Sequence, residues 1–395
     1  MIFYQQKGSS WHLERMFAKP SVRLKDMDLC LNPVRNQAAR LSLKQRNAAC
    51  GAFDLAFGGG LVFYLFIYES LPESQKRRQE EMEMMEMLMQ MGLLALGFLM
   101  LVKGADWFVD GSSGIADRMG VPQLVIGLTI VAMGTSAPEA AVSITAALKG
   151  SAEITIGNIV GSNILNILII LGITSVIVPV AVARSTVRIE IPWMLFITAV
   201  LLVTGCTGNQ VTLMEGVILW VLFLLYLAYL FVMAMRDKQE AVKTEEDKPF
   251  WKLLVLMVIG LVLVVWGSDV TVDAATAIAK AAGLSERFIG LTIVALGTSL
   301  PELFTSVSAA IKGKADIAIG NIVGSNIFNI LFVVGTAALI LPVEFAPSFA
   351  IDTVVAIGAG VLLLACVFKK QLLVRSAGIL MLVSYAGYFV YLMMQ

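Results

Sequence analysis

Histidine is nearly absent from this chain of 395 residues, and the single one, His12, lies near the N-terminus. Without imidazole elsewhere, haem ligation, histidine-dependent zinc sites and Ser/His or Cys/His catalysis lack an essential group. The chemistry left to the chain uses carboxylates, hydroxyls, amides and backbone carbonyls. The sequence offers neither a nucleophile with its base nor a set of ligands for a catalytic metal, so we expect neither an enzyme nor a bound cofactor.

Cysteine and charge are also scarce. The four cysteines have no metal-ligand spacing, and we expect them to pack as small apolar groups. Charged residues make up only 15% of the chain, acids and bases balance, and no basic block interrupts the apolar core. A nucleic-acid partner is therefore not expected, and no feature requires a protein partner. Instead, 58% of the residues are apolar and the mean hydropathy is +0.83, as is typical of a chain embedded in lipid.

Long apolar stretches dominate the sequence from about residue 89 onwards. Each has roughly 20 residues, which is enough for a helix to cross a hydrocarbon core of about 30 Å. We therefore expect an all-α polytopic membrane protein with ten transmembrane helices. The expected spans are 89–110, 121–149, 153–179, 187–206, 211–235, 251–279, 285–311, 315–341, 349–368 and 372–394.

Residues 1–80 differ from the rest of the chain. They are polar and basic, apart from one apolar run at 52–68 that is at the lower length limit for a span. This run could be an eleventh helix or a signal-like segment, although no clear small-residue cleavage site follows it. We interpret residues 1–80 as an extension that the membrane core does not need, either native or upstream sequence read as protein.

The apolar core contains an internal duplication. Residues 126–180 align without gaps with residues 289–343, and about 35 of the 55 aligned positions are identical, far beyond chance. The offset is constant at 163 residues, and four aspartates outside the aligned segments obey it: Asp106 and Asp110 correspond to Asp269 and Asp273. We therefore expect two repeats of five helices, residues 89–236 and 251–395, joined by a loop at 237–250.

The number of helices in each repeat predicts the topology. Because five is odd, the second repeat enters the membrane from the opposite side, and inverted repeats of this kind are typical of secondary transporters. A cytoplasmic loop at 237–250 places thirteen basic residues of the core inside and three outside. We therefore expect an integral protein of the plasma (inner) membrane, with both ends of the core external and the central loop cytoplasmic.

One repeated motif, Gly-Thr-Ser-x-Pro-Glu, places a carboxylate in the middle of an apolar span, at Glu139 and at Glu302. An acidic residue at a helix centre costs about 2.5 to 3.5 kcal/mol, so each glutamate should face a cavity filled with water or ions. The preceding proline opens the helix and frees backbone carbonyls. Thr135 and Ser136 lie four and three residues before Glu139, which predicts one shared face. Two carboxylates would balance one divalent ion, and this mixture of oxygens suits calcium better than magnesium.

A second repeated motif, Gly-Asn-Ile-Val-Gly-Ser-Asn-Ile-x-Asn, occupies residues 157–166 and 320–329. Its serine and last asparagine lie four residues apart and should share a face, offering neutral oxygens that suit a weakly held monovalent ion. The alternative is structural, because small residues let helices approach and amides join helices. We favour ion binding for Ser162, Asn166, Ser325 and Asn329 and the structural role for Asn163 and Asn326. The four aspartates lie towards span ends, where contact with solvent explains them.

These two motifs, repeated in inverted halves of five helices, resemble the alpha repeats of the cation/calcium exchanger superfamily, specifically its sodium/calcium exchanger branch in the short prokaryotic form. The resemblance covers the whole ten-helix core. It implies that calcium is bound by Glu139, Glu302, Thr135 and Thr298. It implies that sodium is bound by Ala132, Ser136, Ser162, Asn166, Ala295, Ser299, Ser325 and Asn329, the two alanines acting through their carbonyls.

The resemblance implies antiport of sodium for calcium by alternating access, with the first and sixth spans moving. The transported ions and the lipid bilayer are the expected partners. In the family that the chain resembles, position 329 is an aspartate in some sodium/calcium exchangers and in the potassium-dependent ones. Here it is asparagine, so potassium cotransport is not expected. Two other hypotheses about the function stay open. The chain could be a cation/proton antiporter in which both glutamates titrate, or a cation channel lined by the same residues.

Overall fold

The computed structural model describes residues 73–236, 249–283 and 295–394. The chain divides into two units, residues 1–88 and 89–395, and the expected membrane core lies in the second. The apolar run at 52–68 lies outside the described residues. A helix already begins at Glu73, within the expected extension, and continues into the core as α5 (Glu73–Met119).

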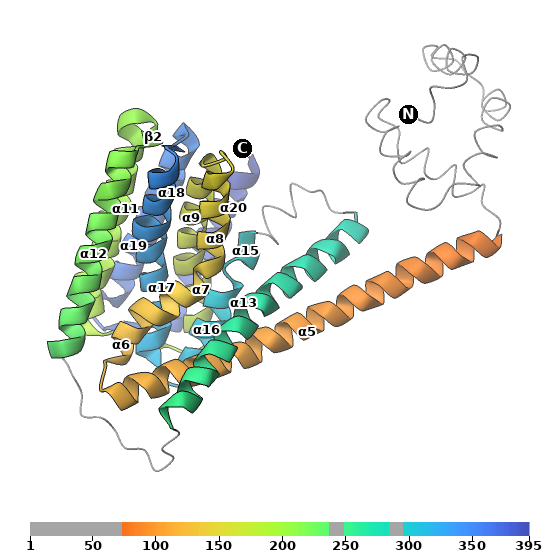
Figure 1. Ribbon diagram of the computed structural model, residues 1–395, viewed down its shortest axis with the longest axis horizontal. Helices are drawn as coiled ribbons and strands as arrows, with labels where there is room; N and C mark the ends of the chain where they lie inside the picture. Colours follow the sequence, from red (N-terminus) through yellow and green to blue (C-terminus); the bar gives the residue numbers. More distant parts are fainter. Residues whose placement is uncertain (1–72, 237–248, 284–294, 395) are drawn as a thin grey trace. The chain divides into compact units, whose positions relative to one another are not determined.

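Helices make up nearly all of the second unit (Figure 1). In the first repeat, α5 is followed by α6 (Gln123–Ile126), η1 (Gly127–Val131), α7 (Ala132–Thr135), α8 (Ala137–Leu148), α9 (Glu153–Leu165), η2 (Asn166–Leu171), α10 (Gly172–Ile177), η3 (Thr186–Glu190), α11 (Ile191–Gly208) and α12 (Leu213–Arg236). The second repeat contains α13 (Phe250–Ala281), α15 (Ala295–Gly297), α16 (Leu300–Ile311), α17 (Ala315–Phe328), η5 (Asn329–Val334), α18 (Gly335–Ile340), α19 (Pro347–Phe368) and α20 (Arg375–Met394). The elements labelled η are short π-helical turns.

The described helices agree with the expected membrane fold. Eight of them are long and apolar enough to cross a bilayer, and one bent pair, Gln123–Thr135 with Ala137–Leu148, counts as a ninth. The expected span 285–311 lies partly outside the described residues, and α16 is its described end. The first span was expected to end near residue 110, but α5 continues to Met119, and its aspartates have polar partners at the end of α16 (Ser308) and directly after it (Lys312).

The helices that carry the second motif lie at the centre of the unit. Within its most apolar stretch, the span Ala315–Ile340 is 94% buried and the span Ile154–Ile177 is 78% buried. The corresponding stretches of α12 and α20 are only 22% and 17% buried, so these helices present most of their surface to the surroundings. The repeated motifs are therefore on the innermost helices, shielded on all sides by apolar ones.

Two short β-ribbons display the inverted relation between the repeats. Strand β1 (Val180–Ala181) pairs with β4 (Leu372–Leu373), and β2 (Gln210–Val211) pairs with β3 (Val343–Glu344), both antiparallel. A shift of 163 residues relates Val180 of β1 to Val343 of β3 and Leu373 of β4 to Gln210 of β2, although the register differs by one residue, because Val343 pairs with Val211. Each repeat therefore contributes one strand to each ribbon, as expected when two copies are related by a two-fold axis.

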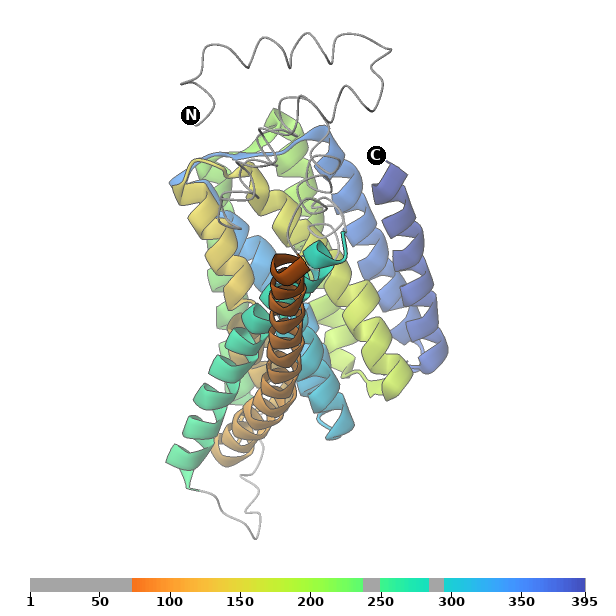
Figure 2. The same ribbon diagram turned by 90° about the vertical axis from the view of Figure 1, so that its right-hand side faces the viewer.

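The first helices of the two repeats, α5 and α13, lie side by side in both views of the ribbon (Figures 1 and 2). Glycines allow their backbones to approach: a Cβ on Gly104 would lie 2.8 Å from the backbone nitrogen of Val264 and 2.9 Å from the carbonyl oxygen of Gly260. Gly97 and Gly111, one heptad away on either side, also face the α13 backbone. Small residues of this kind bring membrane helices into close contact. The two helices form one tightly packed pair.

Candidate functional site

Both glutamate motifs interrupt their helices, as the prolines predicted. In the first repeat, α7 and α8 meet at Ser136 with a bend of 51°, and Ser136 has φ −81° and ψ 8°. In the second repeat α16 begins after Ser299, which has φ −95° and ψ 3°. Pro138 and Pro301 lie in the first turn of the helices that follow. Because of the bend, Thr135 and Glu139 are not neighbours on one straight helix, and the simple spacing argument for their shared face does not apply.

Glu139 and Glu302 each lie in the first turn of the helix after the break and are fully buried. This position favours a negative charge because the helix dipole is positive at its N-terminus. Ser136 donates a hydrogen bond of 2.8 Å to Oε1 of Glu302, and Ser299 donates one of 3.4 Å to Oε1 of Glu139. Each serine therefore binds the glutamate of the other repeat, which brings the two carboxylates to one place.

Four asparagines of the second motif form a cluster across the two repeats. The side-chain amides of Asn163 and Asn326 each donate to the backbone carbonyl of the other, at 3.2 Å. Asn166 donates to Oδ1 of Asn326 at 3.0 Å, and Asn329 donates to Oδ1 of Asn163 at 3.2 Å. Asn163 and Asn326 thus have the helix-joining geometry that we favoured for them. The side-chain nitrogens of Asn166 and Asn329 make these hydrogen bonds, so their side-chain oxygens remain available to bind a ligand.

Four of the buried oxygens that lack a hydrogen-bond partner among the described residues belong to the two glutamates and to the last asparagine of each second motif: Oε2 of Glu139, Oε2 of Glu302, Oδ1 of Asn166 and Oδ1 of Asn329. They form two repeat-related pairs, one from carboxylates and one from amides. A buried charge without a partner is unstable in an apolar interior. None of the described hydrogen bonds of these four side chains comes from a lysine or arginine. The unpartnered oxygens are therefore suited to bind cations. Carboxylate and amide oxygens are the ligands that calcium prefers, and the residues present therefore fit ion binding.

The other expected ligands lie on the elements that carry the two motifs. Thr135 is fully buried and donates to Oδ1 of Asn321 at 2.9 Å, and the hydroxyl of Ser325 reaches the carbonyl oxygen of Ala132 at 3.4 Å. Ser162 is buried in α9, and Thr298 is half-buried between α15 and α16. Ala295 is the first residue of α15, and its side chain lies outside the part of the chain that the structure describes.

Sequence reasoning missed two asparagines that support the glutamate helices. Asn158 donates to the hydroxyl of Ser143 at 2.9 Å and to the carbonyl oxygen of Glu139 at 3.3 Å. Asn321 makes the equivalent bonds to Ser306 at 2.9 Å and to Glu302 at 3.4 Å. These bonds hold each glutamate helix against the neighbouring helix of the second motif. The signal that could have found them is the repeat itself, because both asparagines and both serines recur at the same offset.

Two π-helical turns were also missed. One begins at Asn166 (η2) and the other at Asn329 (η5), so both start at an asparagine with an unpartnered oxygen. A π-turn inserts an extra residue into the helix, and such turns are frequent at functional sites. The turn re-aims the side chains at this point relative to a regular helix.

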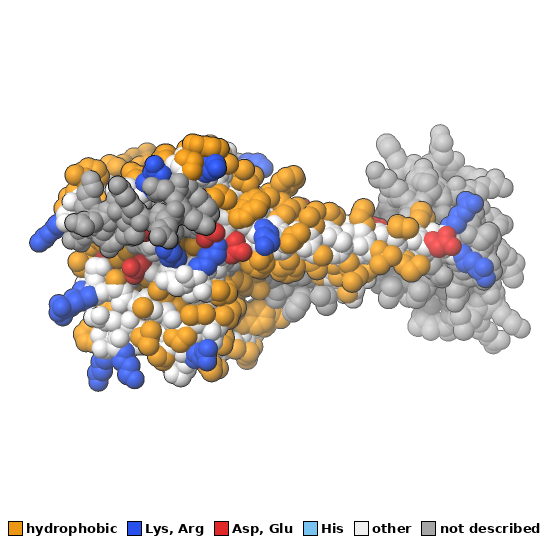
Figure 3. Space-filling view, turned by 90° about the horizontal axis from the view of Figure 1, so that it is seen from below, with side chains coloured by type: hydrophobic (Ala, Val, Ile, Leu, Met, Phe, Trp, Pro, Cys, Tyr) orange, Lys and Arg blue, Asp and Glu red, His pale blue; other side chains and the backbone are white. Residues whose placement is uncertain are grey.

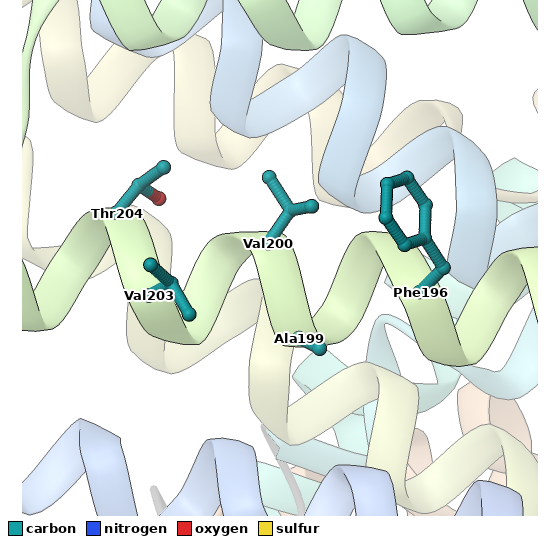
Figure 4. Close-up of a pocket in the computed structure, with 5 residues that line it drawn as sticks. All are labelled: Phe196, Ala199, Val200, Val203 and Thr204. Carbon is teal, nitrogen blue, oxygen red and sulfur yellow. The ribbon is translucent and has the colours of Figure 1, made fainter.

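A surface hollow on α11 offers no comparable site. Figure 4 shows its lining, which consists of Phe196, Ala199, Val200, Val203 and Thr204. Only Thr204 among them carries a side-chain oxygen, and Phe196 and Val203 are exposed on the outer surface. One hydroxyl cannot replace the hydration shell of a cation. The buried oxygens between the repeats are therefore the candidate functional site.

Two sequence relatives share most of this chain. The putative antiporter CaxA of Alkalimonas amylolytica is 39% identical over 313 residues, which cover 76% of this chain and 98% of that protein. The sodium/calcium exchanger MaX1 of Methanosarcina acetivorans is 32% identical over 340 residues, which cover 76% of this chain and 97% of that protein.

Comparison at the levels of structure and family gives the same result. A solved structure of the sodium-calcium exchanger NCX_Mj, soaked with zero Na⁺ and Ca²⁺, matches with a TM-score of 0.68 and 33% identity, over 77% of this chain and 99% of that one. A family model described as sodium/calcium exchanger protein matches residues 89–232 and 252–394, which are the two repeats. The resemblance inferred from the motifs is confirmed, and the chain belongs to the sodium/calcium exchanger family.

Proposed function

We propose that this chain exchanges sodium for calcium across a membrane by alternating access, with the ions bound between its two repeats. The observation that carries the proposal is the crossed pair of contacts, Ser136 with Glu302 and Ser299 with Glu139. It brings two fully buried carboxylates together from opposite repeats, each with one free oxygen. Two such charges neutralise one calcium ion without a protein amine, and membership of the sodium/calcium exchanger family supports this choice of ions.

The ligand sets follow from this arrangement. We assign calcium to Glu139, Glu302, Thr135 and Thr298, and sodium to Ala132, Ser136, Ser162, Asn166, Ala295, Ser299, Ser325 and Asn329. The unpartnered amide oxygens of Asn166 and Asn329 support the sodium assignment because a neutral oxygen suits a monovalent ion. The contact between Ser325 and the carbonyl of Ala132 supports it too, since both oxygens lie at one point. Calcium and sodium would compete because the serines of one set bind the glutamates of the other.

We assign no enzymatic role and no cofactor to the chain, and place it in the plasma (inner) membrane with the loop 237–250 in the cytoplasm. Figure 3 supports this orientation. Lysine and arginine side chains lie around much of the face seen from below, with apolar side chains between and beside them. Basic residues concentrate on the cytoplasmic side of membrane proteins.

The test is calcium uptake into proteoliposomes of the purified full chain. Vesicles loaded with sodium and diluted into sodium-free buffer should accumulate calcium, and vesicles with equal sodium on both sides should not. A pH gradient of either sign should not replace the sodium gradient. Calcium entry without any sodium gradient would identify a channel, and uptake driven by protons alone would identify a cation/proton antiporter.

A further inference from the structure

A cluster of polar contacts joins α5 to the end of the second glutamate helix. Lys312, which directly follows α16, contacts Asp110 at 2.7 Å and Asp106 at 3.5 Å. Its ammonium also donates to the backbone carbonyl of Asp106 at 2.8 Å, and Ser308 donates to the side chain of Asp106 at 2.7 Å. Because Glu302 lies in the first turn of α16, this cluster links α5 to a helix of the ion site.

The duplication supplies a second set of the same residues. A shift of 163 residues relates Asp106 and Asp110 to Asp269 and Asp273 on α13, Lys312 to Lys149 after α8, and Ser308 to Thr145. All four groups keep their chemical type. Their contacts differ, however: no hydrogen bond or ion pair of the described residues joins Asp269 or Asp273 to Lys149, and all three are exposed. The ion pairs are therefore formed in one set and are not formed in its repeat-related copy.

The two aspartate pairs lie at opposite ends of the glycine-packed helix pair. Next to Asp110, Gly111 faces Leu253 and Met257, near the beginning of α13. At the other end Gly97 faces Thr271, two residues before Asp273. A displacement of α5 and α13 together along their axes would therefore carry one aspartate pair towards its lysine and the other pair away.

We propose that these residues are two alternating ionic latches. Asp106 and Asp110 with Lys312 hold one face of the ion site closed, and Asp269 and Asp273 with Lys149 close the opposite face in the other state. The proposal rests on the proposed exchange by alternating access, and it names the positioning residues of that cycle. Half-exposed ion pairs contribute little stability each, so either latch can open within a transport cycle. Matched latches on inverted repeats also keep the two states close in free energy, as a cycle requires.

Cysteine cross-linking tests directly whether each aspartate pair comes close to its lysine during the transport cycle. In a full chain whose four native cysteines are replaced by serine, Asp110→Cys with Lys312→Cys and Asp273→Cys with Lys149→Cys are each treated with a bifunctional methanethiosulfonate reagent that spans the length of a lysine side chain, and assayed for exchange. Both pairs should cross-link, each cross-link should abolish exchange, and dithiothreitol should restore it. With all four cysteines present, closing the first pair should prevent the second from forming. In the control, Asp110→Cys with Lys149→Cys, the two cysteines belong to opposite ends of the helix pair α5 and α13 and should not react.

The proposal would be overturned if the Asp273 and Lys149 pair failed to cross-link at any sodium or calcium concentration while the uncross-linked chain still exchanged ions. That result would leave the proposed function intact.

Charge removal gives a second readout that a purely structural role would not produce. Lys312→Gln should favour the state open on the Lys312 face, and Lys149→Gln the state open on the Lys149 face. The apparent KM for calcium at the Lys149 face should therefore rise by about two- to fivefold in the first variant and fall by a similar factor in the second. Shifts in the same direction, or no shift in either variant, would contradict the proposal.

Discussion

Each buried glutamate receives its serine hydrogen bond from the other repeat and not from its own. Ser136 and Ser299 lie at the two helix breaks, where the chain leaves helical geometry and the hydroxyl can turn towards the opposite repeat. The two carboxylates and the two serines therefore form a single unit. A displacement of one repeat relative to the other would change the surroundings of both glutamates together.

Removal of the Ser136 hydroxyl tests this crossed arrangement. Ser136→Ala takes away the 2.8 Å donor of Glu302, and a hydrogen bond to a charged group is worth about 1.5 to 3 kcal/mol. We expect the KM for calcium in sodium-driven uptake to rise by about tenfold or more. Ser136→Thr keeps the hydroxyl and serves as the control. Equal KM values for the alanine variant and the native chain would show that the contact does not support ion binding.

Asn329 determines whether a further cation is needed. Its amide donates to Oδ1 of Asn163 at 3.2 Å, and an aspartate would replace that donor by a second acceptor and add a third buried negative charge. A cation between the two oxygens would relieve this repulsion. We expect native exchange to need no potassium and Asn329→Asp to become potassium-sensitive. Sodium-driven calcium uptake with and without potassium measures both, and a strict potassium requirement in the native chain would refute the interpretation of Asn329.

At the scale of helices, the close contact between α5 and α13 leaves no room for a larger side chain at the glycines between them. A Cβ on Gly104 would come within 3.0 Å of backbone atoms of α13, whereas one on Gly358 would meet nothing within 4 Å. We expect Gly104→Ala to destabilise the protein by about 1 to 3 kcal/mol through overpacking, and Gly358→Ala to leave it unchanged. Thermal unfolding in detergent compares the two variants. A Gly104→Ala protein as stable as the control would mean that the helices are not packed as described.

Much of the element pattern could be predicted from the sequence. The apolar stretches and the repeat indicated inverted halves, and Pro138 and Pro301 indicated the helix breaks, because these features are local or periodic. The π-turns at Asn166 and Asn329 could not be predicted, since a π-turn leaves the apolar pattern of a buried helix unchanged. The contacts of the serines were missed for another reason. Spacing along one helix says nothing about the opposite repeat, to which both hydroxyls turn.

At the scale of the whole molecule, the first prediction concerns the N-terminal extension. The family match begins at residue 89, and the contacts divide the chain after Leu88. We expect a chain that starts at Met82, and so lacks the apolar run at 52–68, to reach the membrane and exchange ions like the full chain. Membrane abundance and sodium-driven calcium uptake compare the two proteins. Failure of the shorter chain to insert would show that the run at 52–68 is a structural helix of the core.

The central claim is that calcium crosses the membrane between Glu139 and Glu302 in exchange for sodium. The most direct measurement is sodium-driven calcium uptake by Glu139→Gln and Glu302→Gln beside the native chain, at equal abundance in proteoliposomes. Glutamine keeps the shape of the side chain but removes half of the charge that balances calcium. We predict uptake by the native chain and none by either variant, with all three proteins folded. Near-native uptake by either glutamine variant would contradict the account.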